Sequence, residues 1–545
     1  MRAAAAAALV LALLASTAVA QDHPQHPEPA DHAAQARGVP ASEAEAEHSH
    51  VDTLVPTTPT LLAGYGGGGF AVTTGVPEAQ AFFSNGMELG AAFAHGASVA
   101  AMEEAVRLDP ACAMCKWGQA LVAGPTINYG KDRDERKPLY ALAREAQRQA
   151  RRGGTEREKA LTAALVERYK PGNEARRDRA YARAMQTVQA RFPQDNEIAV
   201  LTADAIMQSA FSDYPNLDTV MLSGSIPLLE TVLARAPDHT PAIHFYIHAT
   251  EVLGEPGKAE VHADRLEALA PRASHLVHMP AHTWYWVGRY HDAAATNQRA
   301  VELGKDNARR LGLSDPEGVW GLPYHSHNVI YGLGGALMAG DADIALDLAR
   351  PLVEVSGRRE DGGATSQLLA TLGYQAIARF DPASVAALPE PKLPYLKAAW
   401  HYARGEAAAT AGDAATVQAE MALIPESIEA PEEGESSAPE LMLGIAREVL
   451  AGRLAMLAGD PRAAAEAFRR AAEIEETDSF NDFTDPPAFW YPVRRDVAAA
   501  LLAAGDASGA RIEAEASLRL RIKDPVAEAL LARAEAALEG ATGGD

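Results

Sequence analysis

Apolar and polar positions follow a helical period through most of this chain. From about Pro77 onward, Ala, Leu and other apolar residues recur at spacings of three and four, with Glu, Arg and Gln between them. No segment sustains the two-residue alternation that is typical of a half-buried β-strand. The pattern predicts an all-α protein built from successive amphipathic helices.

A turn pattern divides these helices at a regular interval. The glycine-led turn at residues 254–259 recurs 34 positions later at residues 288–293, and again at residues 340–345. Two prolines that close helices, Pro237 and Pro271, are also 34 positions apart. A unit of this length, with a small residue opening its second helix and a proline at its end, is typical of tetratricopeptide repeats. We therefore expect a tetratricopeptide-like α-solenoid of antiparallel helix pairs.

The first residues have the order of a secretory signal peptide. Arg2 precedes an apolar run at residues 3–15, and the small residues 18–20 follow that run. We expect residues 1–20 to be removed and the protein to be periplasmic or secreted. No later segment offers the roughly 20 uncharged apolar residues of a membrane helix, so no transmembrane segment is expected.

The rest of the chain divides by composition into a leader and a solenoid. Residues 21–76 are rich in His, Pro and Gly, and we expect them to form a disordered leader. The solenoid is expected to occupy residues 77–545. Three polar or Pro/Gly-rich stretches break its period, and we expect insertions there, near residues 131–138, 306–323 and 426–439.

The net negative charge of the chain disfavours some classes of binding partner. The sequence has 49 Lys and Arg against 73 Asp and Glu, which gives a formal net charge of −24. Such an acidic surface repels phosphate backbones, so a nucleic-acid partner is not expected. Cations, basic peptides and neutral ligands suit this charge better.

Histidines gather in the part of the chain with the clearest repeats, where residues 239–327 hold ten of the 17. His244 and His248 are four positions apart, as are His278 and His282, and the second pair follows the first by one repeat. Residues four apart share one face of a helix, and neighbouring helix axes lie roughly 8 to 10 Å apart. We therefore expect a transition-metal site, for copper, zinc or iron. Its expected members are His244, His248, His278 and His282, with Glu251, His275 and His327 as ligands or partners of the ligands.

Other interpretations of these histidines remain open at this point. They could contact a bound peptide or another ligand, or they could pack in the core. Zinc-protease chemistry is disfavoured, because Phe245 follows His244 where such a protease has a catalytic Glu.

The sequence leaves open whether the protein is an enzyme. It shows no nucleophile triad and no phosphate-binding loop. A copper or iron oxidase acting on a small molecule is the main alternative to a binding protein. Its pocket would be formed by aromatic residues that could equally belong to the core, namely Tyr246, Trp284, Tyr285, Trp286 and Trp320.

The chain has two cysteines, Cys112 and Cys115, which open a helix just after a turn. In an exported protein the first expectation is a disulfide between them, because oxidising compartments pair thiols. Metal binding, redox activity and free thiols are the alternatives. Haem attachment is not expected, because Lys116 stands where the attachment motif requires His.

Several segments resemble the exported bacterial proteins that are known by their tetratricopeptide repeats. The similarity covers most of the chain from about Gln80 to Gly505. The segments that carry it are residues 112–118, 244–251, 278–282, 287–290, 324–328 and 485–494. That family has no settled activity, so the resemblance implies an architecture but no reaction.

The resemblance also implies where the histidines point. In such repeats the first helix of each pair lines a concave groove, which would hold a protein, a peptide or a small molecule. The two histidine pairs and Glu251 would face that groove. One position departs from the family, because Ile330 stands where relatives carry a second His after the His327-Asn328 pair. If that His is a ligand in the relatives, the site in this chain would be one ligand short.

Overall fold

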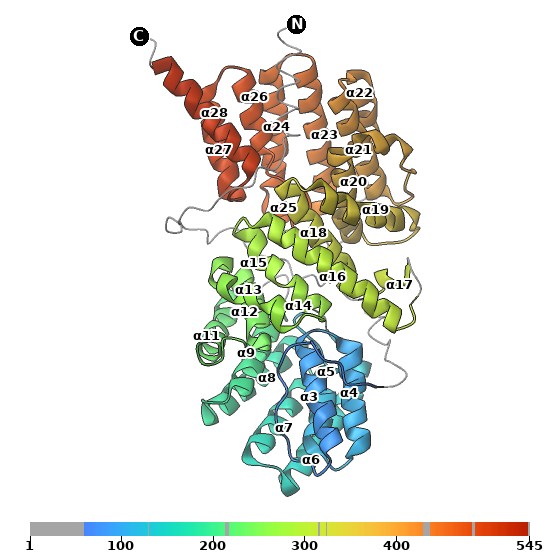
Figure 1. Ribbon diagram of the computed structural model, residues 1–545, viewed down its shortest axis with the longest axis vertical. Coiled ribbons are helices and arrows are strands. Elements are labelled where there is room, and N and C mark those ends of the chain that lie inside the picture. Colours follow the sequence, from blue (N-terminus) through green and yellow to red (C-terminus); the bar gives the residue numbers. More distant parts are fainter. Residues whose placement is uncertain are drawn as a thin grey trace. The chain divides into compact units, whose positions relative to one another are not determined.

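The computed structural model describes residues 59–128, 130–212, 217–313, 317–322, 324–428, 436–481 and 486–542. The described chain forms two compact units (Figure 1). The N-terminal unit comprises residues 59–283 and 299–325 within these ranges, and the C-terminal unit comprises residues 284–298 and 326–542. The expected signal peptide and residues 21–58 of the expected leader lie outside the described residues.

Every regular element in the described part of the chain is a helix. The N-terminal unit contains α3 (Pro77–Ala91), α4 (His95–Leu108), α5 (Ala113–Val122), α6 (Arg133–Gly153), α7 (Glu156–Tyr169), α8 (Glu174–Arg191), α9 (Asn196–Phe211), α10 (Thr219–Ser223), α11 (Ile226–Arg235), α12 (Thr240–Val252), η2 (Pro256–Ala259), α13 (Glu260–Leu269), α14 (Ser274–His278) and α17 (Glu317–Trp320). Three helices contribute residues to both units, α15 (Pro280–Trp286), α16 (Tyr290–Arg310) and α18 (His325–Ala339). The C-terminal unit contains α19 (Ala342–Arg358), α20 (Ala364–Phe380), η3 (Pro382–Ala387), α21 (Pro394–Ala411), α22 (Ala414–Leu423), α23 (Ala438–Leu457), α24 (Pro461–Glu475), α25 (Asp478–Asn481), α26 (Arg494–Ala503), α27 (Ala507–Leu520) and α28 (Pro525–Thr542).

Consecutive helices pack against each other within each unit, for example α7 against α8 and α23 against α24. Because short turns join them, the partners run antiparallel. The predicted fold class, all-α with tetratricopeptide-like helix pairs, is confirmed. Among the described helices, none is both long and apolar enough to cross a membrane.

The turn glycines of the repeat end the first helix of each pair. All of them have φ between 73° and 82°, a left-handed conformation that glycine adopts without the steric cost of a Cβ atom. In four of these turns an Asp follows and caps the next helix, as when Asp341 accepts from the N–H of Ile344. The glycines are Gly254, Gly288, Gly340, Gly412, Gly459 and Gly505, and the four capping residues are Asp341, Asp413, Asp460 and Asp506.

The cysteine prediction is confirmed, because Cys112 and Cys115 form a disulfide. Cys112 is the N-cap of α5, and its sulfur accepts a hydrogen bond from the N–H of Cys115 at 3.0 Å. Both residues are buried in the same apolar cluster as Trp117. The disulfide therefore closes the first turn of a core helix.

Two of the expected insertions differ from the prediction. Residues 131–138 mostly belong to α6, because Asp132 and Glu135 form a capping box that starts this helix early and Pro138 fits within its first turns. In the stretch 306–323, α16 continues to Arg310 and α17 occupies four further residues. Residues 429–435 of the third stretch lie outside the described residues.

The last part of the expected leader, residues 59–76, is an ordered strap on the N-terminal unit, so the prediction of disorder is wrong there. The side chain of Asn85 on α3 pairs with both the N–H and the carbonyl of Leu62, each at 2.8 Å. The hydroxyl of Thr240 on α12 accepts from the N–H of Gly67 at 2.6 Å. Glycines that indicated flexibility in the sequence instead allow the backbone to approach the helices closely.

Gly66 tests this explanation. Its φ is 92°, and a Cβ atom at this position would lie 2.5 Å from the hydroxyl oxygen of Thr240. We predict that Gly66→Ala lowers the free energy of unfolding by roughly 1 to 3 kcal/mol, because it adds both overlap and backbone strain. Gly75→Ala is the matched control, since a Cβ atom there meets nothing within 4 Å. Urea titration of the two variants gives the comparison, and equal stabilities would contradict the close-approach explanation.

Candidate metal centre

Helix α12 presents His244, His248 and Glu251 on one face. The helix opens with Pro241 in its first turn, where the missing N–H of proline has no cost. Ile243 and Ile247 point into the core of the N-terminal unit and hold the helix in place. His244 has no exposed surface, and Glu251 is 5% exposed. These polar groups are therefore fixed inside the unit.

His275, His278 and His282 come from the following repeat. The first two lie on α14 and His282 lies on α15. Helix α14 ends at His278 and α15 begins at Pro280, and Met279 between them keeps helical backbone angles with φ of −51° and ψ of −37°. All three imidazoles are buried, with exposures of 5%, 0% and 2%.

Three Nε2 atoms converge at the centre of the cluster. The Nε2 of His244 lies 3.0 Å from the Nε2 of His275 and 3.2 Å from the Nε2 of His248. All three ligand atoms lie within 4.8 Å of one another. Two nitrogens that bind one tetrahedral ion at about 2.0 to 2.1 Å are separated by about 3.3 Å, which is close to these distances.

The protonation of His244 follows from its other nitrogen. Nδ1 lies 2.8 Å from the carbonyl oxygen of Ala91, which can only accept, so Nδ1 carries the proton. Burial lowers the pKa of His244 to about 3, an effect that the Ala91 carbonyl partly opposes and that His282 and His95 reinforce. The ring is therefore neutral near pH 7, and its Nε2 presents an unprotonated lone pair to His275 and His248.

His278 and His282 form a second group beside this triad. Their Nε2 atoms are 2.8 Å apart, and the Nδ1 of His282 lies 2.7 Å from a carboxylate oxygen of Glu251. A carboxylate behind an imidazole fixes the ring orientation and leaves Nε2 to face a ligand, as is common around metal-binding histidines. The two groups adjoin, since the rings of His248 and His282 are 5.6 Å apart and those of His275 and His278 are 5.7 Å apart.

The N-terminal unit thus brings together six of the seven residues expected at the site. Their arrangement differs from the expected one, because His275 joins the central triad while His278 and His282 form a separate pair. A carboxylate oxygen of Glu251 lies 2.7 Å from Nδ1 of His282. His327 belongs to the C-terminal unit, where its ring lies 5.6 Å from that of Tyr331, and its role as a ligand stays a prediction.

Sequence reasoning did not find the residues that enclose the triad. The ring of Phe93 lies 4.5 Å from that of His244 and 4.8 Å from that of His275. The ring of Tyr324 lies 4.4 Å from that of His275, and its hydroxyl accepts a hydrogen bond from Asn128 at 3.1 Å. Tyr324 stands beside the histidines of a segment that carried the resemblance, but nothing in the sequence marked Phe93.

The aromatic residues suggested for an enzyme pocket do not line one beside the triad. Tyr246 is buried and its hydroxyl donates to Glu230, while Trp320 packs against His325. Trp284, Tyr285 and Trp286 belong to the C-terminal unit.

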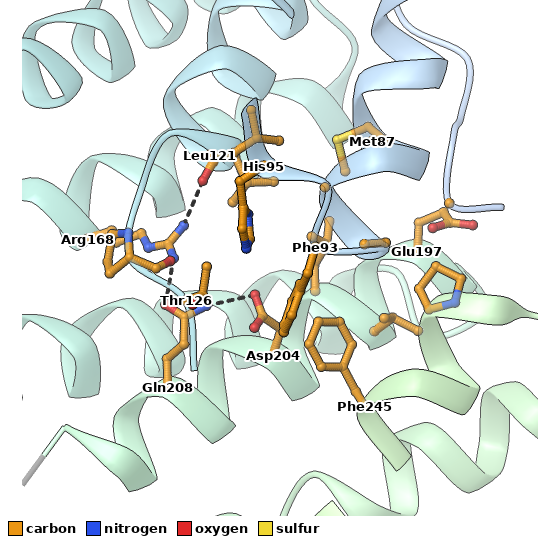
Figure 2. A pocket seen from close by; sticks show the side chains of 18 residues that line it. Met87, Phe93, His95, Leu121, Thr126, Arg168, Glu197, Asp204, Gln208 and Phe245 are labelled. Carbon is orange, nitrogen blue, oxygen red and sulfur yellow. Dashed lines mark hydrogen bonds between the residues drawn. The ribbon is translucent and has the colours of Figure 1, made fainter. Parts of the chain in front are cut away.

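A cavity of about 680 Å³, part of it open to solvent, lies in the N-terminal unit instead (Figure 2). The turn between α3 and α4 separates it from the triad, because Ala91 and Phe93 both line the cavity and contact His244. Phe245, Arg168 and Asp204 also line this cavity.

Comparisons with known proteins add little to this geometry. No protein-family model matches the chain, and no curated protein matches it. Similar solved structures include the APC/C hetero-tetramer Cut9-Hcn1, at 13% identity and a TM-score of 0.29, over 84% of this chain and 76% of that one. They also include the TPR domain of P58(IPK), at 12% identity and a TM-score of 0.23, over 85% of this chain and 99% of that one. Yeast Tom70 is similar at 11% identity and a TM-score of 0.26, over 86% of this chain and 90% of that one.

Buried neutral histidines predict a loss of stability in acid. Burial lowers the pKa of His325 to about 3, as it does for His244, whereas an unfolded His titrates near 6.5. Below pH 6.5 the unfolded chain gains protons that the folded chain does not, so the free energy of unfolding falls as pH falls toward 3. In chelator-treated protein, His325→Gln should remove part of this slope, roughly 1 kcal/mol per pH unit between about pH 4 and 6.

Urea titrations across this pH range measure the slope. His291→Gln is the control, because the side chain of His291 is 67% exposed. Parallel slopes for the wild type and His325→Gln would show that His325 is not held neutral by burial.

Proposed function

We propose that this protein binds a transition-metal ion through the Nε2 atoms of His244, His248 and His275. The observation that carries the proposal is the convergence of these atoms on one point. An imidazole-only set suits zinc or copper, and also iron, better than calcium or magnesium. The two histidine groups together would form the binding centre of the N-terminal unit.

Hydrogen bonding alone does not account for the triad. The Nε2 of a neutral His244 has a single lone pair in the plane of its ring, yet two other Nε2 atoms lie within 3.2 Å of it. One of them can donate to this lone pair, and the other then faces a nitrogen with nothing left to accept. A shared cation is attracted by all three lone pairs at once, which is the arrangement that ligation requires.

Burial argues against a peptide as the partner of these histidines. His244 and His278 have no exposed surface, and His275 and His282 have 5% or less. A peptide on the surface of the unit could not reach the nitrogens of these four residues, and only His248 of the cluster is partly exposed. The position inside a folded unit favours a retained ion over a transiently captured one.

A metal-dependent enzyme is the second candidate, and one observation favours it. Three protein ligands leave a fourth position of a tetrahedral ion available, as in catalytic zinc sites. A mostly apolar cavity that is partly open to solvent lies on the other side of the Phe93 turn. In such an enzyme the histidines would hold the ion and Glu251 would fix the orientation of His282.

Export is part of the proposal. Residues 1–20 have the order of a signal peptide, and a disulfide between Cys112 and Cys115 is the state that an oxidising compartment favours. A periplasmic or extracellular protein with a histidine site would encounter metal ions outside the buffered cytoplasm.

Metal content tests the central proposal. Protein purified without a histidine tag should contain a transition metal in stoichiometric amount, measured by inductively coupled plasma mass spectrometry after dialysis. His244→Ala and His275→Ala should each lose most of it, because two imidazoles hold an ion far more weakly than three. His291→Ala removes an exposed histidine and should keep the metal. Full metal retention in both triad variants would refute the site.

The substitution Glu251→Gln tests whether His278 and His282 contribute to the metal site of the triad. Glutamine keeps the size of the side chain but removes the charge that holds the Nδ1 proton of His282. If the pair contributes to binding, the affinity for Zn²⁺ in a competition titration with a chelator should fall about 10- to 100-fold. Glu230→Gln is the control, since Glu230 accepts from Tyr246 and not from the cluster. An unchanged affinity would confine the site to the triad.

A further inference from the structure

The cavity in the N-terminal unit has a mostly apolar wall that also carries the charged side chains of Arg168, Asp204 and Glu197. Leu121, Val200, Phe93 and Phe245 supply apolar surface. Arg168 and Asp204 lie near each other with Gln208 between them, and Glu197 lies apart from both (Figure 2).

The terminal nitrogens of the Arg168 guanidinium are bound to the protein, while its Nε has no hydrogen-bond partner within the described part of the chain. Arg168 is 2% exposed, and its guanidinium donates to the carbonyls of Leu121 and Pro125 and to the side-chain oxygen of Gln208. Its charge acts on two carboxylates at once, Asp204 and Asp178. Asp178 does not line the cavity and is also near Arg177 and Arg136, so the carboxylate of the cavity wall on which Arg168 acts is Asp204.

Only one of the two carboxylate oxygens of Asp204 accepts a hydrogen bond within the described part of the chain. Gln208 lies between this carboxylate and Arg168, donating to Oδ2 of Asp204 at 2.8 Å while it accepts from Arg168. Within the described part of the chain, Oδ1 accepts no hydrogen bond and no cation lies within ion-pair distance of the carboxylate. Burial raises the pKa of this group, as expected for a carboxylate whose charge is poorly compensated. A half-buried carboxylate that lines a cavity, with one oxygen that accepts no hydrogen bond from the described residues, suits a cationic group.

The rings on the cavity wall fit the same ligand class. Phe93 and Phe245 line the cavity with ring centroids 6.4 Å apart, and the electron-rich face of an aromatic ring attracts an organic cation. Glu197, the other carboxylate on the wall, is already bound to His239 at 2.9 Å. Asp204 is therefore the acidic group that remains for a ligand.

We propose that this cavity binds a small organic cation, an ammonium group on an apolar body, with Asp204 as its counter-ion and Phe93 and Phe245 around its apolar part. The proposal does not depend on metal at the histidine triad, since no residue of the triad lines the cavity.

Matched probes test the charge requirement on the intact chain. Benzylammonium, benzyl alcohol and benzoate have similar shapes and differ in charge, and isothermal titration calorimetry gives their affinities. The protein is treated with chelator first, because a neutral amine could otherwise ligate a metal ion. Benzylammonium should bind at least about tenfold more tightly than the alcohol, and benzoate should bind least.

Substitution of the counter-ion completes the test. Asp204→Asn keeps an oxygen for Gln208 and removes the charge, so it should weaken benzylammonium binding about tenfold or more and leave benzyl alcohol unaffected. Asp178→Asn is the control, because it removes a carboxylate that acts on Arg168 but does not line the cavity. Circular dichroism and thermal melting check that both variants fold.

Three results would overturn the proposal. They are equal binding of benzylammonium and benzyl alcohol to the wild type, equal losses in the two variants, and no binding of benzylammonium at millimolar concentration. The first and third depend on the wild-type protein alone, so the proposal stays falsifiable if Asp204→Asn does not fold.

Discussion

The hydrogen bond from Nδ1 of His244 to the carbonyl of Ala91 determines the chemistry of the candidate site. Ala91 is the last residue of α3, so its carbonyl has no partner within the helix and is available to an outside donor. The bond places the His244 proton on Nδ1 and so leaves Nε2 as a lone pair in a dry interior. His275 and His248 then face a nitrogen that can ligate or accept, and a shared cation satisfies all three rings. Without this bond the same rings could form a chain of N–H···N contacts with no ligand.

The turn that supplies this carbonyl also builds the cavity wall. Phe93 has φ of 54°, a left-handed conformation that is uncommon for a residue with a bulky side chain and carries strain. In this conformation its ring lies against the triad on one side and lines the cavity on the other. A ligand that displaced Phe93 would disturb His244 and His275 directly. The candidate metal centre and the cavity are therefore neighbours that share one strained turn.

Much of this could be predicted from the sequence, because it depends on local periodicity. The helical pattern, the glycine-led turns and the pairing of Cys112 with Cys115 all follow from residues close together along the chain. The two histidine pairs also follow from local spacing, since the two residues of each pair are one helical turn apart. The fold class and the gathering of these imidazoles in one unit could thus be predicted without coordinates.

The remaining features depend on contacts between distant residues. Ala91 and His244 meet across 153 positions, and a backbone carbonyl has no signature in a sequence. His275 lies in the triad although it is 31 positions from His244, a long-range contact that the spacing within one helix does not predict. Residues 59–76 look disordered by composition, yet Asn85 and Thr240 bind their backbone. Composition indicates how much conformational entropy a segment loses when it becomes ordered, but it does not identify the residues whose hydrogen bonds offset that loss.

The most direct test of the account is to locate the ion itself. Crystals of the protein soaked or grown with Zn²⁺, with diffraction data collected on both sides of the zinc absorption edge, give an anomalous map that shows zinc alone. The account predicts one peak in the N-terminal unit at about 2.0 to 2.1 Å from the Nε2 atoms of His244, His248 and His275. A map with no peak inside this unit, or a peak that contacts neither His244 nor His275, would contradict it.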